Sequence, residues 1–343
     1  MNLRDRIRDG MDFASKTTLE IGPLYRPFVL KSEGDVMYVD HADTETLRKK
    51  YADDPLFDVA SIVDVDAVWG EQTLSECLGA GRKVDYIIAS HVIEHVPDLI
   101  TWLRELRSVL GEGGQIRLVI PDKRFTFDYT RRLTVFSDVV DAYLRKARRP
   151  LTLYIIDHIL NVRRVDTVAA WLCRLDEDSL PPYHSFDMAV DVAKDALETN
   201  HYHDVHCWVF TPQSFAKLMR QAAENDLVDL VCSSFEDTLH NTLEFTAFLR
   251  ASNDKQTIID SWRKMEASVD AALRGSLEYE KEQLKSKIEK LHSTRTELEN
   301  ALAREEELRA ALAASQATVS AYASSTSWKL TAPLRALMRI FRR

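Results

Sequence analysis

The sequence predicts an α/β fold: a doubly wound, mostly parallel sheet with a helical insertion, followed by a C-terminal coiled coil. Three observations predict it. Short runs rich in valine and isoleucine alternate with helical stretches up to residue 122, as expected for strands buried on both faces of a parallel sheet. Residues 123–200 contain no clear strand run and keep apolar residues every three or four positions. From about residue 255, leucines recur every seven residues between charged neighbours.

Composition limits the class of protein. The chain has 343 residues, of which 45% are hydrophobic, enough to bury a sizeable core. Its formal net charge of −9 argues against a nucleic-acid partner, because neutralising phosphates needs a basic surface. No apolar run approaches the roughly 18–20 residues that span a bilayer. The cysteines form no CxxC pair and predict reduced thiols in a cytoplasmic protein: Cys77, Cys173, Cys207 and Cys232.

Strand and helix signals follow one another along the chain. The helix between the last two parallel strands is predicted over 99–110, where leucines have helical spacing and GEGG (111–114) ends the helix. Strand, helix and strand in this order imply right-handed crossovers. The predicted parallel strands are residues 17–21, 35–40, 58–66, 84–90 and 115–121. After the insertion, the predicted strands are 201–215, 227–237 and 242–252, with a helix after the first.

These signals divide the chain into four parts. We expect an N-terminal helix over 1–16 and an α/β domain over 17–250, within which the insertion forms a lid at about 123–200. A coiled coil is expected over 255–318, and a basic amphipathic tail over 319–343.

The coiled-coil prediction rests on a heptad pattern of about four repeats. Leu277, Leu284, Leu291 and Leu298 are seven residues apart, and Ile288 and Leu302 hold the companion positions. A narrow leucine stripe with charged flanks favours paired helices, and hence a homo-oligomer. The alternative is a single solvated helix packed on its own domain.

The tail has a different charge pattern. The last 36 residues contain no acid. Pro333 suits a helix start, after which Leu334, Leu337, Met338 and Phe341 share one face and arginines another. Such a helix is typical of a peripheral contact with a membrane, here the inner face of the cell membrane. Docking on an acidic protein is the alternative. An oligomer would present several copies and strengthen a weak attachment.

Polar residues follow the predicted strands at the edge where open parallel sheets bind ligands. Asp40 closes the second strand, and one carboxylate can accept from both hydroxyls of a ribose. Gly22, after the first strand, lets a ligand approach the backbone. An acid after the third strand, Asp66 or its neighbour Asp64, could bond an exocyclic amine. Together these residues predict a site for an adenosine-bearing cofactor.

Four stretches resemble motifs of the class I methyltransferases that use S-adenosyl-L-methionine (SAM): LEIGP, YVD, VDYIIASHVIEHVPD and LRELRSVLGEGGQIRLVIPD. The resemblance covers about residues 17–122. Within that family, LEIGPL, HVIEHV, HCWVFTP and the tail SSTSWKLTAPLRAL are similar to a type 11-like subgroup associated with bacterial surface-polysaccharide biosynthesis. It implies a Rossmann-like fold, SAM as cofactor, and O-methylation of a sugar in a polysaccharide or its precursor. The substrate would then be a glycan or a nucleotide sugar.

The resemblance also implies roles for single residues. Glu20 would lie near the methionine amino group of SAM, Asp40 at its ribose and Asp66 at its adenine. Ser90 and His91 would line the pocket beneath the sulfonium.

The first motif departs from the family pattern. Its glycine-rich loop is replaced by Gly22-Pro23-Leu24-Tyr25-Arg26-Pro27. The prolines stiffen the loop and remove two backbone donors. Arg26 could compensate by pairing with the carboxylate of the cofactor. The alternative is that this loop no longer binds a cofactor.

A hydroxyl acceptor must also lose a proton, and the candidate bases are His91, Asp122 and His206, any of which could instead be structural. HYHDVHC (201–207) suggests zinc ligands, but strand alternation would separate its histidines, so no metal site is predicted. Four cations near the lid could meet a phosphate or an anionic sugar, or face solvent on a charged helix: Lys123, Arg124, Arg131 and Arg132.

Two other functions compete with methyl transfer. A non-catalytic scaffold would keep the sheet, lose the cofactor through the prolyl loop and act through its coiled coil. A nicotinamide-dependent oxidoreductase could also use Asp40, but no GxGxxG follows the first strand.

Overall fold

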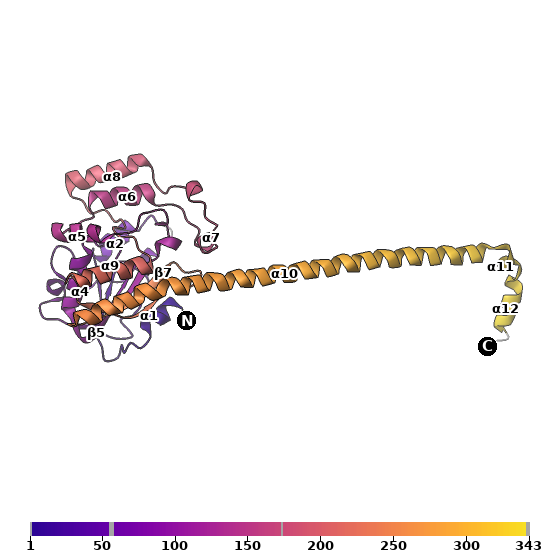
Figure 1. The fold of residues 1–343 in the computed structure, drawn as a ribbon, viewed down its shortest axis with the longest axis horizontal. Coiled ribbons are helices and arrows are strands. Elements are labelled where there is room, and N and C mark those ends of the chain that lie inside the picture. The colour runs from indigo at the N-terminus through magenta and orange to yellow at the C-terminus, as the bar shows by residue number, and fades with distance from the viewer. Residues whose placement is uncertain (1, 55–57, 173, 341–343) are drawn as a thin grey trace. The chain divides into compact units, whose positions relative to one another are not determined.

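The computed structural model describes residues 2–54, 58–172 and 174–340, and the chain forms two compact units, Met1–Gly275 and Ser276–Arg343. The first unit is built on one seven-stranded sheet in the order β3-β2-β1-β4-β5-β7-β6, with helices around it (Figure 1). β1 to β5 pair in parallel, and β7 pairs antiparallel with β5 and β6. This confirms the doubly wound, mostly parallel α/β fold. The strands are β1 (Thr18–Ile21), β2 (Val36–Asp40), β3 (Ala67–Val68), β4 (Val84–Ser90), β5 (Leu110–Pro121), β6 (Leu230–Glu236) and β7 (Glu244–Ala251).

The central strands are apolar on both faces, and this buries them. Every residue of β1 is buried, and Ile87 and Ile88 at the centre of β4 are fully enclosed. Ile21 at the end of β1 pairs with Val39 of β2 and Ala89 of β4. The carboxyl ends of these three strands therefore lie level with one another at one edge of the sheet.

Helices fill the predicted insertion. α6 and α8 lie side by side in it, away from the sheet (Figure 1). The predicted helix at 99–110 is α4, whose first turn is capped by Asp98 and which ends at Val109, as the glycine turn predicts. The helices of the first unit, before the last, are α1 (Leu3–Arg8), α2 (Thr44–Lys50), α3 (Leu74–Leu78), α4 (Leu99–Val109), α5 (Phe136–Arg145), α6 (Thr152–Asn161), α7 (Thr167–Trp171), α8 (Phe186–Thr199) and α9 (Pro212–Glu224).

The strand predicted at 58–66 is wrong. A short 3₁₀ turn, Val59–Ser61, occupies its start, and β3 begins only at Ala67. The carboxylate of Asp66 accepts a hydrogen bond from the backbone N–H of Tyr38 in β2. This side-chain bond takes the place of a strand-to-strand bond at the N–H of Tyr38, so β3 pairs with β2 only from Ala67 onward.

The strand predicted at 201–215 is also wrong. Residues 200–211 are irregular, although 205–210 are buried. Their backbone bonds to the loop after β4: the N–H groups of Cys207 and Trp208 both donate to the carbonyl of Glu94. This segment is buried and apolar like a strand, but among the described residues it makes no strand-to-strand hydrogen bonds, which explains the wrong prediction. Cys77, Cys207 and Cys232 are free thiols, and Cys173 lies outside the described residues.

The last helix of the first unit continues into the second. α10 (Lys255–Ser324) buries Ile258, Trp262 and Met265 against the sheet, and the indole N–H of Trp262 donates to the carbonyl of Leu230 at 2.8 Å. Its first turns therefore belong to the α/β unit, which extends to Gly275 rather than ending near 250.

The second unit is helical, as predicted. Beyond Gly275 the heptad residues that the structure describes are exposed, among them Leu284, Leu291 and Leu298, at 45%, 69% and 59%; the side chain of Leu277 lies outside the described set. α11 (Thr326–Leu330) and α12 (Ala332–Ile340) follow, and residues 341–343 also lie outside it. Among the described helices, none has both the length and the apolar character to cross a membrane.

A buried carboxylate secures the loop after β1. Glu20 is 2% exposed, and its two oxygens accept from the backbone N–H groups of Phe28 and Val29, at 2.7 and 3.1 Å. Burial raises the pKa of Glu20 from 4.5 to about 7, although the two N–H groups act in the opposite direction. The native state thus holds this proton more tightly than the unfolded chain does.

We predict that replacing Glu20 with Gln makes unfolding less dependent on pH. Because the folded pKa is raised, the contribution of Glu20 to stability is fully present below pH 4.5 and declines as the pH rises to about 7. The free energy of unfolding of the wild type should therefore fall relative to E20Q by about 1–3 kcal/mol over this range. Urea unfolding at several pH values measures the difference.

Glu33 provides the matched control from the same loop. Hydrogen bonds from Leu30 and Arg8 lower its pKa, so Glu33 stays ionised between pH 5 and 8. The difference in free energy of unfolding between E33Q and wild type should therefore be constant over this range. A pH-independent difference between E20Q and wild type would contradict the prediction.

Candidate active site

A cavity of about 1380 Å³ opens at the carboxyl ends of β1, β2 and β4. Of the predicted site residues, Gly22, Asp40 and His91 line it. Pockets for a single small ligand usually have volumes of roughly 300–1,000 Å³. This cavity is therefore large enough for a cofactor together with a second substrate.

Asp40 stands where the sequence predicts, at the end of β2 and at the cavity wall. It is 5% exposed, and its Oδ1 accepts from the backbone N–H of His41 at 2.7 Å and lies 2.6 Å from the His41 Nδ1. Oδ2 accepts no hydrogen bond from any residue that the structure describes. A buried carboxylate with one unused oxygen, facing a cavity, fits a diol such as the hydroxyls of a ribose.

Gly22 has a structural cause that the sequence does not reveal. Its φ is +66°, and an added Cβ would lie 2.9 Å from Cγ2 of Val92, in the loop after β4. Both facts require glycine before any ligand is considered. The close approach that Gly22 permits is thus to Val92, while its backbone still forms cavity wall.

Glu20 and Arg26 do not line the cavity, contrary to their predicted roles. Both oxygens of Glu20 are engaged by the loop backbone, as described above. Arg26 is exposed, and its guanidinium lies 4.8 Å from the centre of the Tyr25 ring. Neither residue is placed to meet the methionine part of a cofactor in this conformation.

Asp66, Ser90 and Asp122 also lie outside the cavity lining. Asp66 precedes β3 and is held by Tyr38 and Lys31, two residues short of the sheet edge where Asp40 lies. Asp122 is fully buried, ion-paired with Arg124, and accepts from the Thr238 hydroxyl at 2.7 Å. Ser90 is half-buried at the end of β4. The predicted adenine partner is therefore an exposed brace between Tyr38 and Lys31, and one predicted base, Asp122, is an internal brace.

Of the three candidate bases, His91 alone lines the cavity. It follows β4 directly with a φ of +53°, a conformation uncommon outside glycine, and its side chain is 39% exposed. Its Nδ1 lies 3.5 Å from Oε1 of Glu94. Strained backbone at the end of a central strand is a frequent mark of a functional position.

His206 lies behind the cavity wall rather than on it. It is 7% exposed, and its Nδ1 lies 2.6 Å from Oδ2 of Asp128. Arg131, which the sequence offered to a phosphate, is buried between Asp128 and Asp157, each 2.8 Å away. Arg124 and Arg132 likewise pair with internal carboxylates. These cations therefore neutralise internal carboxylates, most of them in the lid, and do not face the cavity.

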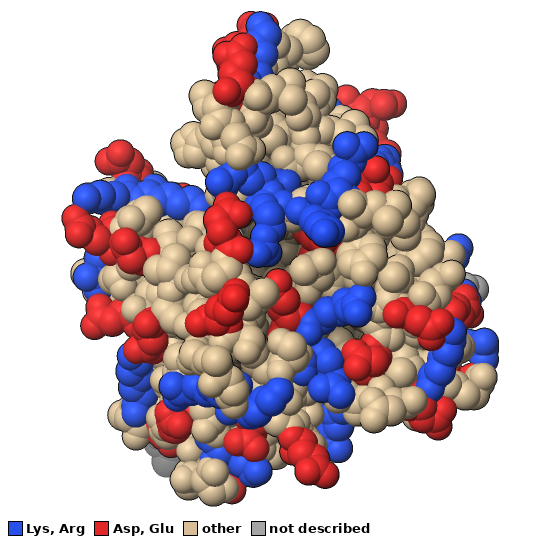
Figure 2. Space-filling model, turned by 90° about the vertical axis from the view of Figure 1, so that its left-hand side faces the viewer, with Lys and Arg blue, Asp and Glu red and all other residues tan. Residues whose placement is uncertain are grey.

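Sequence reasoning missed a second group of cations that does line the cavity. They come from α4 and from the end of α5: Arg104, Lys146, Arg148 and Arg149. Two carboxylates share the wall with them, Glu71, 3.2 Å from Arg149, and Glu105, 3.8 Å from Arg148. Lys and Arg side chains gather around a hollow on this face (Figure 2). The run RKARRP (145–150) was the available signal.

Three further wall residues were not predicted. Trp69 directly follows β3, and Tyr202 and Asp204 come from the irregular segment after α8. His95 and Lys50 hold the pKa of Asp204 below its usual range, against the effect of burial. The strand error at 201–215 concealed the last two residues, since a strand would have placed them in a ladder.

One comparison with known proteins identifies a family. A family model described as a methyltransferase domain matches residues 35–223, more than half of the chain. Similar solved structures include the CurJ carbon methyltransferase (12% identity, 72% of this chain, TM-score 0.35), about half of whose length (51%) is covered. Others are DhpI with SAH (14%, 73% and 82% of the two chains, 0.36) and CcbJ methyltransferase from Streptomyces caelestis (12%, 73% and 89%, 0.34).

A comparison with curated proteins gives no significant match. The family match, together with the cavity at the ends of β1, β2 and β4, is sufficient for assignment. The protein belongs to the methyltransferase-domain family, and its cofactor is S-adenosyl-L-methionine.

Proposed function

We propose that the protein transfers a methyl group from SAM to a hydroxyl of a sugar, in a surface polysaccharide or its nucleotide-sugar precursor. One observation carries the proposal: a single cavity has a free carboxylate oxygen at Asp40 and a group of four cations further along its wall. The first suits a ribose and the second an anionic acceptor. The likeness of HVIEHV, HCWVFTP and the tail to proteins of polysaccharide biosynthesis supports the choice of acceptor.

The residues at the strand ends fit the cofactor in part. Asp40 would hold the ribose, and apolar wall residues beside it, Ile21, Val92 and Trp69, would contact the adenine and the methionine chain. Glu20 and Arg26 are directed elsewhere, so the amino acid end of SAM would be held mainly by backbone groups. When bound, SAM supplies a methyl group activated by a positively charged sulfur.

The protein must then align the acceptor and take its proton. Methyl transfer is an in-line displacement, so most of the rate comes from holding the oxygen in position and excluding water. His91 faces the cavity and is the base we propose. Its imidazole would take the hydroxyl proton as the new oxygen–carbon bond forms.

The cation group favours an acceptor that carries phosphate or carboxylate. Four positive side chains gather in one part of the wall, where Glu71 and Glu105 pair with two of them, on a protein whose overall charge is −9. Arginine and lysine bind phosphate oxygens by charge-assisted hydrogen bonds. A neutral monosaccharide could accept hydrogen bonds from them but would gain no attraction between opposite charges.

The non-catalytic scaffold is the second candidate. The prolyl loop and the engagement of Glu20 favour it, since both differ from what the cofactor motif implies. In either case we propose that the exposed heptad leucines of α10 pair in a homo-oligomer. We also propose that α12 contacts the inner face of the membrane, because Leu334, Leu337 and Met338 are exposed and no acid lies nearby.

We predict that D40N weakens SAM binding roughly 10- to 100-fold, because an amide replaces a charged acceptor for two hydroxyls. Isothermal titration calorimetry of the full chain with SAM measures this. D64N is the control, since that side chain is 87% exposed and lies outside the cavity lining. Undetectable binding to the wild type would favour the scaffold, and an unchanged D40N would overturn the ribose assignment.

We predict that the double substitution R104Q and K146N raises KM for a nucleotide sugar roughly five- to tenfold and leaves kcat unchanged, because it removes ground-state attraction. Asparagine tolerates the left-handed backbone of Lys146. R145Q is the control, because Arg145 pairs with Asp141 on the exposed face of α5. Methyl transfer to nucleotide sugars and to the matching neutral sugars provides the measurement; equal KM values for both classes would contradict an anionic acceptor.

We predict that L291K reduces the mass measured by analytical ultracentrifugation to that of a smaller species, while A303K, at an outward heptad position, does not. Flotation with anionic vesicles should decline both in L291K, through lost multivalency, and in a chain ending at residue 323. Monomeric wild type would refute the coiled coil. Equal flotation of the full and shortened chains would refute the membrane contact.

A further inference from the structure

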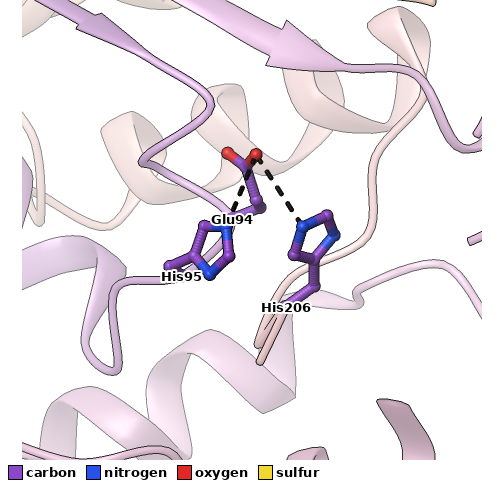
Figure 3. Close-up of side chains that lie close together, drawn as sticks. All are labelled: Glu94, His95 and His206. Carbon is purple, nitrogen blue, oxygen red and sulfur yellow. Dashed lines mark ion pairs between the residues drawn. The ribbon is translucent and has the colours of Figure 1, made fainter. Parts of the chain in front are cut away.

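A buried cluster beside the cavity is not used by the proposed methyl transfer. It consists of Glu94 and His95, in the loop after β4, and of His206, from the irregular segment. His206 lies 112 residues after Glu94 in the sequence. Figure 3 shows the two imidazoles directed toward the carboxylate. We call these three residues the Glu94 cluster.

The carboxylate of Glu94 lacks the partners that burial demands. The residue is 0% exposed, and neither of its oxygens makes a hydrogen bond to any residue that the structure describes. The nearest cationic or donor groups to Oε1 are His95 Nε2 and His206 Nε2, each at 4.0 Å, and His91 Nδ1 at 3.5 Å. An isolated buried carboxylate is costly, so something should neutralise it.

Protonated imidazoles do not explain this geometry. An imidazolium bonded to a carboxylate would bring nitrogen and oxygen to about 2.7–2.9 Å, whereas His91 Nδ1 is at 3.5 Å and both Nε2 atoms are at 4.0 Å. The three groups instead surround a common point without touching. Their ligand atoms all lie within 4.8 Å of one another.

Two further carboxylates lie behind the imidazoles, and one of them orients His206. Asp204 lies 2.7 Å from Nδ1 of His95, and Asp128 lies 2.6 Å from Nδ1 of His206. Nδ1 of His95 lies close to Asp204 but makes no hydrogen bond to any residue that the structure describes. Asp128 hydrogen-bonds Nδ1 of His206 and so leaves the lone pair of its Nε2 directed at Glu94. Histidines that bind metals are almost always held in this way by an outer carboxylate or carbonyl.

The backbone holds the two segments of the cluster together. The carbonyl of Glu94 accepts from Cys207 N and Trp208 N at 2.7 and 3.1 Å, and the Trp208 indole donates to the carbonyl of Val96 at 2.6 Å. The ligand atoms are thus positioned by buried backbone on both sides. Donors that share one metal ion at 2.0–2.2 Å lie roughly 3–3.5 Å apart, so the two 4.0 Å separations from Glu94 would have to shorten by about 0.5–1 Å to complete the site.

We propose that the Glu94 cluster binds a first-row transition-metal dication. Two imidazole nitrogens and one carboxylate oxygen suit Zn²⁺, Fe²⁺, Mn²⁺ or Co²⁺, whereas Mg²⁺ and Ca²⁺ prefer oxygen ligands alone. The ion neutralises Glu94. His95 also lines the cavity, which places the ion at the cavity wall. The proposal concerns metal binding and stands whatever the methyl acceptor is.

The chain contains an internal comparison. Asp195, His201 and His203 also lie within 4.8 Å of one another, but His201 is 69% exposed and His203 Nε2 already bonds Asp195 at 2.8 Å. That cluster has neither a buried unpartnered carboxylate nor outer carboxylates for its histidines. It serves as the matched control.

The test is metal binding by the full chain with its affinity tag removed. After dialysis against a chelator, Zn²⁺ is titrated in competition with a chromophoric chelator, and Co²⁺ binding is followed by visible absorption. We expect one equivalent in the wild type and in the H201A/H203A variant. E94Q should bind at least roughly 100-fold more weakly, and D128N roughly 10- to 100-fold, because Asp128 positions His206.

Thermal unfolding provides a second readout, which can also be applied to variants that bind no metal. Zn²⁺ should raise the Tm of the wild type and leave that of E94Q unchanged, and metal-free E94Q should unfold at a higher temperature than metal-free wild type, because the buried charge is gone. Less than a tenth of an equivalent in the wild type overturns the proposal. Unchanged affinity in E94Q, or its loss in H201A/H203A, overturns it as well.

Discussion

The site depends on the joint between the loop after β4 and the irregular segment 205–208. One carbonyl, that of Glu94, receives two backbone N–H groups from that segment, and the Trp208 indole closes a third bond to the same loop. This joint brings the chain back from the lid to the end of the central strand. It therefore helps to hold Asp204 at the cavity wall and His206 beside Glu94.

The strand register makes the other half of the site. Because β1, β2 and β4 end level with one another, a glycine, an aspartate and a histidine from three distant stretches reach one cavity. Asp40 remains the residue whose geometry best matches its predicted role. The other predicted acids, buried Glu20 and Asp122 and exposed Asp66, are braces, each bonded to a neighbouring backbone or side chain, and this explains why acids stand so regularly at strand ends here.

Periodicity was enough to predict most of the fold. Buried parallel strands are rich in valine and isoleucine, so β1, β2, β4 and β5 could be predicted, as could α4 and the helical insertion. Two strands were predicted wrongly because residues 58–66 and 201–215 have the apolar pattern of a strand but do not pair with a neighbouring strand of the described chain over these ranges. In the site, Glu20, Asp66 and Asp122 could not be assigned from sequence, since a carboxylate at a strand end can turn toward a ligand or toward loop amides. His206 and Glu94 meet only through tertiary contacts.

The proline-bounded loop after β1 has a consequence for how a ligand arrives. Pro23 and Pro27 fix two backbone angles, and the Glu20 carboxylate anchors the chain just beyond them. A segment that is already rigid loses little conformational entropy when a molecule settles against it. The rate of ligand entry into the cavity should then be limited by diffusion and desolvation, and not by a slow rearrangement of the loop around the ligand.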